Sequence, residues 1–100
     1  MSWLDVADDY GRRYIVRIIR YKVKNPQGIH AGPAALLANQ FSQFKCDVII
    51  KKDQNAVNAK RIFALMSLNI KQGDTITIVF EGEDEKAASK AAEKFLKDNL

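Results

Sequence analysis

The sequence predicts an α+β fold, a two-layer open-faced sandwich in which three helices cover one face of a four-stranded, mainly antiparallel sheet. Three observations predict it. Residues 15–24 are β-branched and aromatic, with apolar and basic residues alternating over 19–24, and a second alternation runs over 75–81, which is the strand period. Apolar residues recur every three or four positions after residue 33 and again after residue 86, which is the helix period. The connections are too short for parallel crossovers throughout, so the order β-α-β-β-α-β-α favours two layers.

The first half of the chain supplies a strand, a helix and a hairpin. In strand 15–24, Ile19, Tyr21 and Val23 alternate with basic residues, and 25–28 (NPQG) is a turn. The following helix has one apolar stripe, formed by Ala34, Leu37, Ala38, Phe41 and Phe44. A second strand over 46–51, a turn over 52–55 and a short strand over 56–58 complete this half.

The second half supplies a short helix, a strand and a long helix. The short helix covers 60–68, and a turn at 72–74 leads into strand 75–81. Acidic residues at 83–85 suit the positive end of the last helix, which runs to about residue 98.

Composition indicates one domain of ordinary soluble character. We expect an N-terminal extension over 1–14, an arm without a sustained period, before a domain over 15–100. No apolar run reaches membrane-spanning length, and three Asp precede the first Arg, which does not suit a signal or transit peptide. We therefore expect a cytoplasmic protein without membrane insertion. Cys46 is the only cysteine, which excludes an internal disulfide and favours a structural thiol.

The net charge of +4 is unevenly distributed, since 10–24 carries six basic residues and no acid. Such a segment is a solvated strand face, a basic surface for an acidic protein partner or, least favoured, a nucleic-acid surface. No finger, helix-turn-helix or stacked-aromatic signature accompanies it. We therefore expect no nucleic-acid partner, and steep salt dependence of binding would be the sign of one.

His30 is the only histidine and stands where a glycine-containing loop meets a helix. Helix starts leave backbone N–H groups unpaired, here those of Ala31, Gly32 and Ala34, and these favour an anion such as phosphate. An imidazole there is either a phosphoryl acceptor or an ordinary cap or surface residue. A metal centre needs more ligands than this chain owns, and no nucleophile is paired with His30. The pattern does not fit an ordinary hydrolase or a metalloenzyme. It suits a carrier protein, for which we expect no cofactor.

The stretch NPQGIHAGPAALLANQF resembles the active-site segment of the histidine-containing phosphocarrier (HPr) family of the bacterial sugar phosphotransferase system. VNAKRIFALMSLNIKQGDTITIVFEGEDEKAA is similar to the other hallmark region of that family, and the resemblance covers 16–98. It implies that His30 accepts a phosphoryl group from Enzyme I and passes it to sugar-specific acceptors. The protein would then be a monomeric carrier, itself the substrate of enzymes rather than one of them.

Two positions depart from the family pattern. Gly32 replaces an Arg that lies beside the phosphohistidine in the family, and Arg61 replaces the Ser that a kinase phosphorylates in many members. One hypothesis is that Arg61 reaches His30 and supplies the missing guanidinium. The alternative function is a specialised or degenerate paralogue, a regulatory protein-binding module with weak or no phosphotransfer. The extension over 1–14 favours some specialisation.

The resemblance also implies a docking surface on the short helix. Ile62, Phe63 and Met66 would contact partners, with Lys60 and Arg61 at the rim. Helical spacing alone would place Phe63 in the core, whereas the resemblance predicts that it is exposed and that Ile62 or Leu65 points inward.

Overall fold

The computed structural model describes residues 2–7 and 13–100, with side chains described from Val16 onward. Its elements are β1 (Ser2–Ala7), β2 (Arg13–Lys22), α1 (Ala31–Ser42), β3 (Asp47–Lys52), β4 (Asn55–Asn58), α2 (Ile62–Ser67), β5 (Thr75–Glu81) and α3 (Glu85–Asn99).

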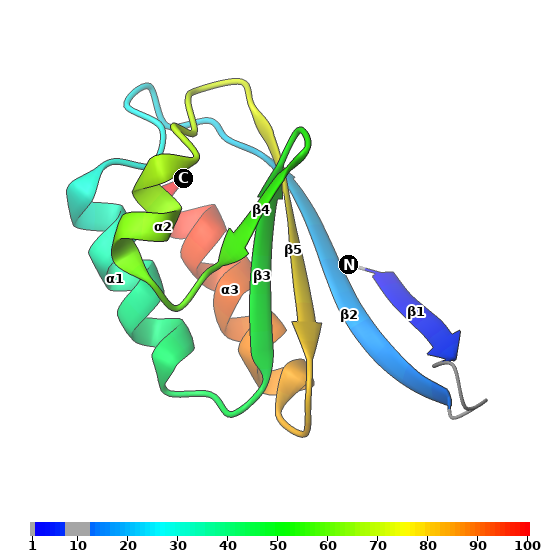
Figure 1. Ribbon diagram of the computed structural model, residues 1–100. Helices are drawn as coiled ribbons and strands as arrows, with labels where there is room; N and C mark the ends of the chain where they lie inside the picture. Colours follow the sequence, from blue (N-terminus) through cyan, green and yellow to red (C-terminus); the bar gives the residue numbers. More distant parts are fainter. Residues whose placement is uncertain (1, 8–12) are drawn as a thin grey trace.

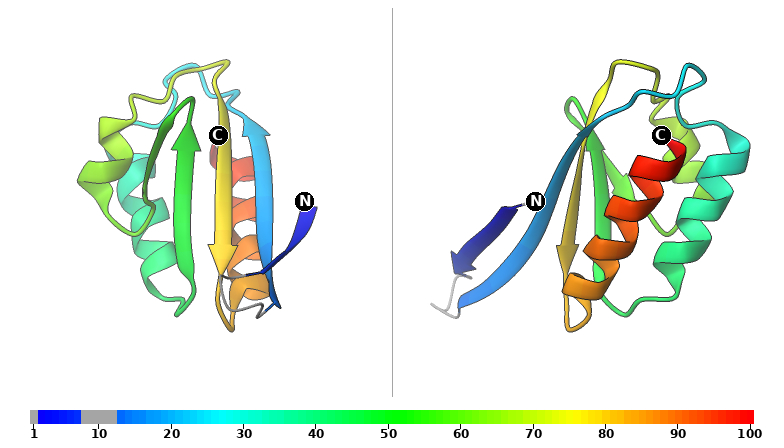
Figure 2. Two further views of the ribbon diagram at one scale, coloured as in Figure 1. Left: turned by 45° about the vertical axis from the view of Figure 1, so that its right-hand side comes forward. Right: turned by 180° about the vertical axis from the view of Figure 1, so that it is seen from behind.

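The sheet has the strand order β1-β2-β5-β3-β4, and every neighbouring pair is antiparallel (Figure 1). The three helices lie on one face of it and leave the other face uncovered (Figure 2). β2, β5, β3 and β4 are the four predicted strands, and the predicted open-faced α+β sandwich is confirmed.

The prediction of an arm before residue 15 is wrong where the structure describes that segment. Ser2–Ala7 forms β1, which pairs with Arg13–Ile18 along the outer side of β2. β2 itself begins at Arg13, so it crosses the expected domain boundary at residue 15. The part of the predicted arm over 8–12 lies outside the described residues. β1 is formed by pairing with the edge of β2 and has no periodic sequence, so the sequence pattern did not predict it.

The core lies between the sheet and the helices, as the two periods predicted. Every second residue of β5 is fully buried, namely Ile76, Ile78 and Phe80. The apolar stripe of α1 packs against them, and the rings of Phe41 and Phe80 meet edge to face with centroids 5.8 Å apart. Phe44, which was predicted to belong to the stripe, lies beyond the end of α1 and is only half-buried.

Cys46 is a buried thiol at the entry to β3. Burial, reinforced by the neighbouring Asp84 carboxylate, raises the pKa of the Cys46 thiol to about 12. Asp84 accepts hydrogen bonds from the backbone N–H groups of Lys45 and Cys46, each at 2.8 Å, which lower the pKa of its carboxyl group. A thiol held protonated in this way is a poor nucleophile, in agreement with the structural role predicted for Cys46.

Candidate functional site

His30 is the N-cap residue of α1, directly before the first helical residue Ala31. Its backbone is extended (φ −108°, ψ −174°), and its carbonyl accepts the first bond of the helix, from Ala34 N–H at 2.9 Å. The imidazole makes no capping hydrogen bond and is exposed to solvent. His30 is therefore not a side-chain cap, which was one of the two structural alternatives. Its ring is exposed, as expected both of a surface residue and of a phosphoryl acceptor.

The backbone segment before His30 contacts the loop that follows α2. Ile29 is buried, and its N–H donates to the carbonyl of Ile70 at 3.1 Å. Gly28 has φ +63°, and a Cβ there would overlap that same carbonyl. The Gly before Ile29 is therefore required by the close approach of two backbone segments, the His30 loop and the loop that follows α2.

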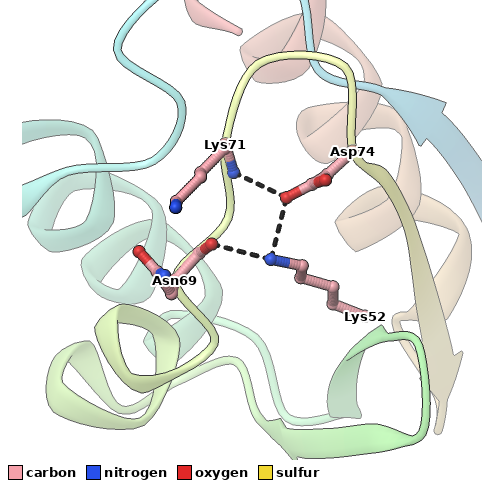
Figure 3. A network of polar contacts seen from close by, with 4 residues as sticks. All are labelled: Lys52, Asn69, Lys71 and Asp74. Carbon is pink, nitrogen blue, oxygen red and sulfur yellow. Dashed lines mark hydrogen bonds and ion pairs between the residues drawn. The ribbon is translucent and has the colours of Figure 1, made fainter.

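A polar network fixes the second of these segments (Figure 3). The Lys52 ammonium group, at the end of β3, donates to the Asn69 carbonyl and forms an ion pair with Asp74, both at 2.8 Å. Asp74 also accepts from the Lys71 backbone N–H at 2.8 Å. The Lys52 contact, followed by the Lys71 bond, lowers the pKa of the Asp74 carboxyl group. The network joins β3 to residues 69–74, which include the carbonyl that supports Ile29.

The first turn of α1 offers two backbone donors in front of the imidazole. The N–H groups of Ala31 and Gly32 are at positions where a helix provides no partner, and Pro33 has no N–H. The prediction that Ala34 is a third donor is wrong, because its N–H is bonded to the His30 carbonyl. The anion-binding capacity of this helix start therefore rests on Ala31 and Gly32.

Gly32 lies directly beside the ring. A Cβ at this position would contact His30 Cε1, the carbon between the two ring nitrogens, at 3.8 Å, which is an ordinary van der Waals distance. The backbone of Gly32 is not in the left-handed region. Nothing in the local geometry therefore requires a glycine at 32, and a longer side chain would stand next to the imidazole.

Large apolar side chains are exposed on the two helices near His30. Phe63 on α2 is 82% exposed and Met66 is 40% exposed, whereas Leu65 is fully buried and Ile62 half-buried. The prediction that Phe63 points outward and Leu65 inward is confirmed. Leu36 on α1, which the sequence analysis missed, is 60% exposed. We call Leu36, Phe63 and Met66 the apolar face.

The structure does not bring Arg61 to His30. The Lys60 carbonyl accepts from Ser42 Oγ at 3.4 Å, and the Lys60 ammonium group donates to the Phe44 carbonyl at 2.7 Å. Lys60 and Arg61 therefore adjoin the end of α1 at Ser42, about 16 Å along the helix axis from Ala31. The expectation that the start of the short helix lies next to the histidine is wrong. It is the segment after α2, at Ile70, that meets the His30 loop.

This constellation suits acceptance of an anionic group by a single exposed imidazole. Among the described residues, no cluster of three or more His, Cys, Asp or Glu side chains could hold a metal ion. No helix of the described chain is both long and apolar enough to cross a membrane. An open-faced α+β sandwich with a lone accessible histidine at a helix start and apolar side chains beside it defines a small carrier-type domain.

Comparison with known proteins identifies the family. The family model of the PTS HPr component phosphorylation site matches residues 19–98. The chain therefore belongs to the HPr family of phosphocarrier proteins of the phosphotransferase system. β1 lies before the matched residues.

Relatives of two kinds are similar to this chain. The HPr-like protein Crh of Halalkalibacterium halodurans is 44% identical over 75% of this chain and 89% of its own length. The phosphocarrier protein HPr of Mycoplasma pneumoniae is 43% identical over 78% of this chain and 90% of its own length. The crystal structure of HPr from Bacillus anthracis is 38% identical, with a TM-score of 0.76 over 81% of this chain and 96% of that one.

Proposed function

We propose that His30 is the phosphoryl acceptor and donor of this phosphocarrier. A ring nitrogen forms a bond to phosphorus as the bond between phosphorus and the Enzyme I donor breaks, and the reverse exchange delivers the group to a sugar-specific component. The chain is thus a substrate of the enzymes on either side of it. The observation that carries this proposal is the exposed imidazole at the N-cap position of α1, which makes no side-chain capping bond.

The N–H groups of Ala31 and Gly32 hold the transferred group. They lie at the positive end of α1, where an anion is favoured by both the helix dipole and the unpaired donors. The departure at Gly32 removes a guanidinium but leaves this backbone cradle in place. Because a charge-assisted hydrogen bond contributes about 1.5–3 kcal/mol, transfer without it is about 10- to 150-fold slower.

Partners dock through the apolar face and the exposed part of α2. Phe63 and Met66 provide exposed apolar area on α2, Ile62 supports them from its half-buried position, and Arg61 lies exposed at the rim. The Lys60 ammonium group donates to the Phe44 carbonyl, so Lys60 is less available than Arg61 to pair with an acidic group of a partner. Enzyme I and sugar-specific components are the partners that family membership implies.

The test is phosphorylation by phosphoenolpyruvate and Enzyme I of the same organism, followed by intact-mass measurement at neutral and acidic pH. We expect one acid-labile phosphoryl adduct on the parent protein and none on His30→Ala. The variant should unfold at the same urea concentration as the parent, since His30 is exposed and makes no side-chain hydrogen bond. An adduct that persists in His30→Ala would reject the assignment.

A regulatory binding module is the second candidate. The observations that favour it are the absence of the family Arg at Gly32 and the similarity to proteins named HPr-like protein Crh. In that case the cognate Enzyme I would give no adduct on the parent protein, while the apolar face would still bind a partner.

A further inference from the structure

A second surface lies on the flank of α3 that faces away from α1. It is a groove of about 540 Å³ between β2 and the C-terminal half of α3. This volume is in the range of ligand-binding sites. Seen from behind, α3 lies between β2 and α1 (Figure 2), and the groove is on the β2 side of α3. The groove is therefore separate from the His30 site.

Four basic residues line the groove. Lys90, Lys94 and Lys97 project from α3 at positions i, i+4 and i+7, and Arg20 comes from β2. All four are exposed, and none makes a hydrogen bond or ion pair within the described part of the chain. Their charges are thus available to an outside partner.

Among the described residues, Glu93 and Asp98 are the only acids along the lining, so the groove keeps a positive balance. Its floor is apolar. Ile19 and Leu96 are buried in the core, and the Tyr21 hydroxyl donates to the Leu96 carbonyl at 3.0 Å. A groove with an apolar floor and charged walls suits an extended segment that carries charged side chains better than a flat charged surface would.

Among the described residues, none pairs with the outer edge of β2 beyond Ile18, where β1 pairs with Arg13–Ile18. β5 pairs with the opposite edge of β2 as far as Lys22. On the β5 side, the Val23 N–H donates to the Asp74 carbonyl, and the Val23 carbonyl accepts from the Gly73 N–H. Because backbone groups alternate along a strand, the N–H and C=O groups of Arg20 and Lys22 point to the outer edge.

We propose that this groove binds an extended acidic segment of a partner protein, which adds a strand to β2 alongside Arg20 and Lys22. The backbone groups of Arg20 and Lys22 supply the pairing, as in other cases of strand addition to a sheet edge. Acidic side chains on alternate positions of the segment meet Lys90, Lys94 and Lys97. The same cations disfavour a basic strand, including a second copy of β2, at this edge.

The test is binding of a fluorescent octapeptide of alternating Glu and Val to the full chain, measured by anisotropy. We expect Lys90→Gln, Lys94→Gln and Lys97→Gln together to weaken binding about tenfold, since each exposed ion pair contributes modestly. The matched control, with Lys45→Gln, Lys51→Gln and Lys71→Gln, removes the same charge from exposed lysines outside the groove and should bind almost as the parent does.

A second measurement tests the strand pairing. On titration with the peptide, the backbone amide signals of Arg20 and Lys22 should shift, and those of Ala31 and Gly32 should not. Equal weakening in the two triple variants would overturn the proposal, because net charge alone would then explain binding. So would a thymidine oligonucleotide that binds more tightly than the peptide with the same lysine dependence, or peptide binding without a shift at Arg20 and Lys22.

Discussion

The surface around His30 and the groove beside α3 differ in charge. Helices α1 and α2 contain no charged residue, whereas α3 carries lysines and acids along its length. The first surface exposes Leu36, Phe63 and Met66, and the second exposes unpaired cations. We expect apolar contact to determine affinity on the first, and charge to determine rate and specificity on the second. The two surfaces can therefore be altered independently.

The largest effect is expected when the arginine that the family carries at position 32 is restored beside His30. Gly32→Arg should speed phosphoryl transfer from Enzyme I by about 10- to 150-fold, because the guanidinium would stand beside the imidazole. Rapid-quench measurement of the transfer rate checks this. Gly32→Ala is the matched control, and an equal gain with Ala would show that charge is not the cause.

The next largest effect, a loss of activity, is expected when the most exposed apolar side chain is removed. Phe63→Ser should lower kcat/KM for Enzyme I by about 30-fold, the effect of losing one interface hot spot. Stability should hardly change, since Phe63 is 82% exposed. The triple lysine variant of the groove should keep the parent kcat/KM. A loss there as large as in Phe63→Ser would contradict the independence of the two surfaces.

The two glycines that flank His30 should respond in opposite directions. Gly28→Ala should reduce the free energy of unfolding by about 2–4 kcal/mol, because φ is +63° and the added Cβ meets the Ile70 carbonyl. Gly32→Ala should raise it by about 0.5–1 kcal/mol, since the helix gains a better helix former. Urea unfolding measures both, and stabilisation by Gly28→Ala would refute the described contact with Ile70.

The smallest effect is the acid dependence contributed by Asp74. Its pKa is lower in the folded than in the unfolded chain, so its stabilisation is present at neutral pH and is lost as pH falls below the ordinary value of 3.8. Asp74→Asn should therefore be less stable than the parent at pH 7, and the difference should shrink towards pH 3. Urea midpoints across that range provide the measurement, and a difference that grows on acidification would have the wrong sign.

The sequence predicted the parts of the site that depend on local pattern. Alternation and helical spacing placed β2, β5, α1 and α3, and the glycine before Ile29 and the residues around His30 located the helix start. Leu36 was missed because it lies within an apolar run. Its position off the stripe of Ala34, Leu37 and Ala38 was the signal that could have identified it.

Features set by tertiary arrangement could not be predicted in this way. The direction in which α2 crosses α1 determines that Lys60 meets Ser42 and that Ile70 meets Ile29, and no local pattern encodes it. The same is true of the Lys52–Asp74 ion pair, whose members are far apart in sequence. β1 escaped prediction because an edge strand needs pairing partners more than it needs alternation.

The most direct test of the central claim is an amide NMR spectrum of the chain before and after phosphorylation by its own Enzyme I. We predict that the signals of His30, Ala31 and Gly32 shift most, and that those of Arg20, Lys90 and Lys94 stay unchanged. That result would place the phosphoryl group on His30 against the first-turn N–H groups. Phosphorylation that leaves the Ala31 and Gly32 signals unmoved would contradict the account.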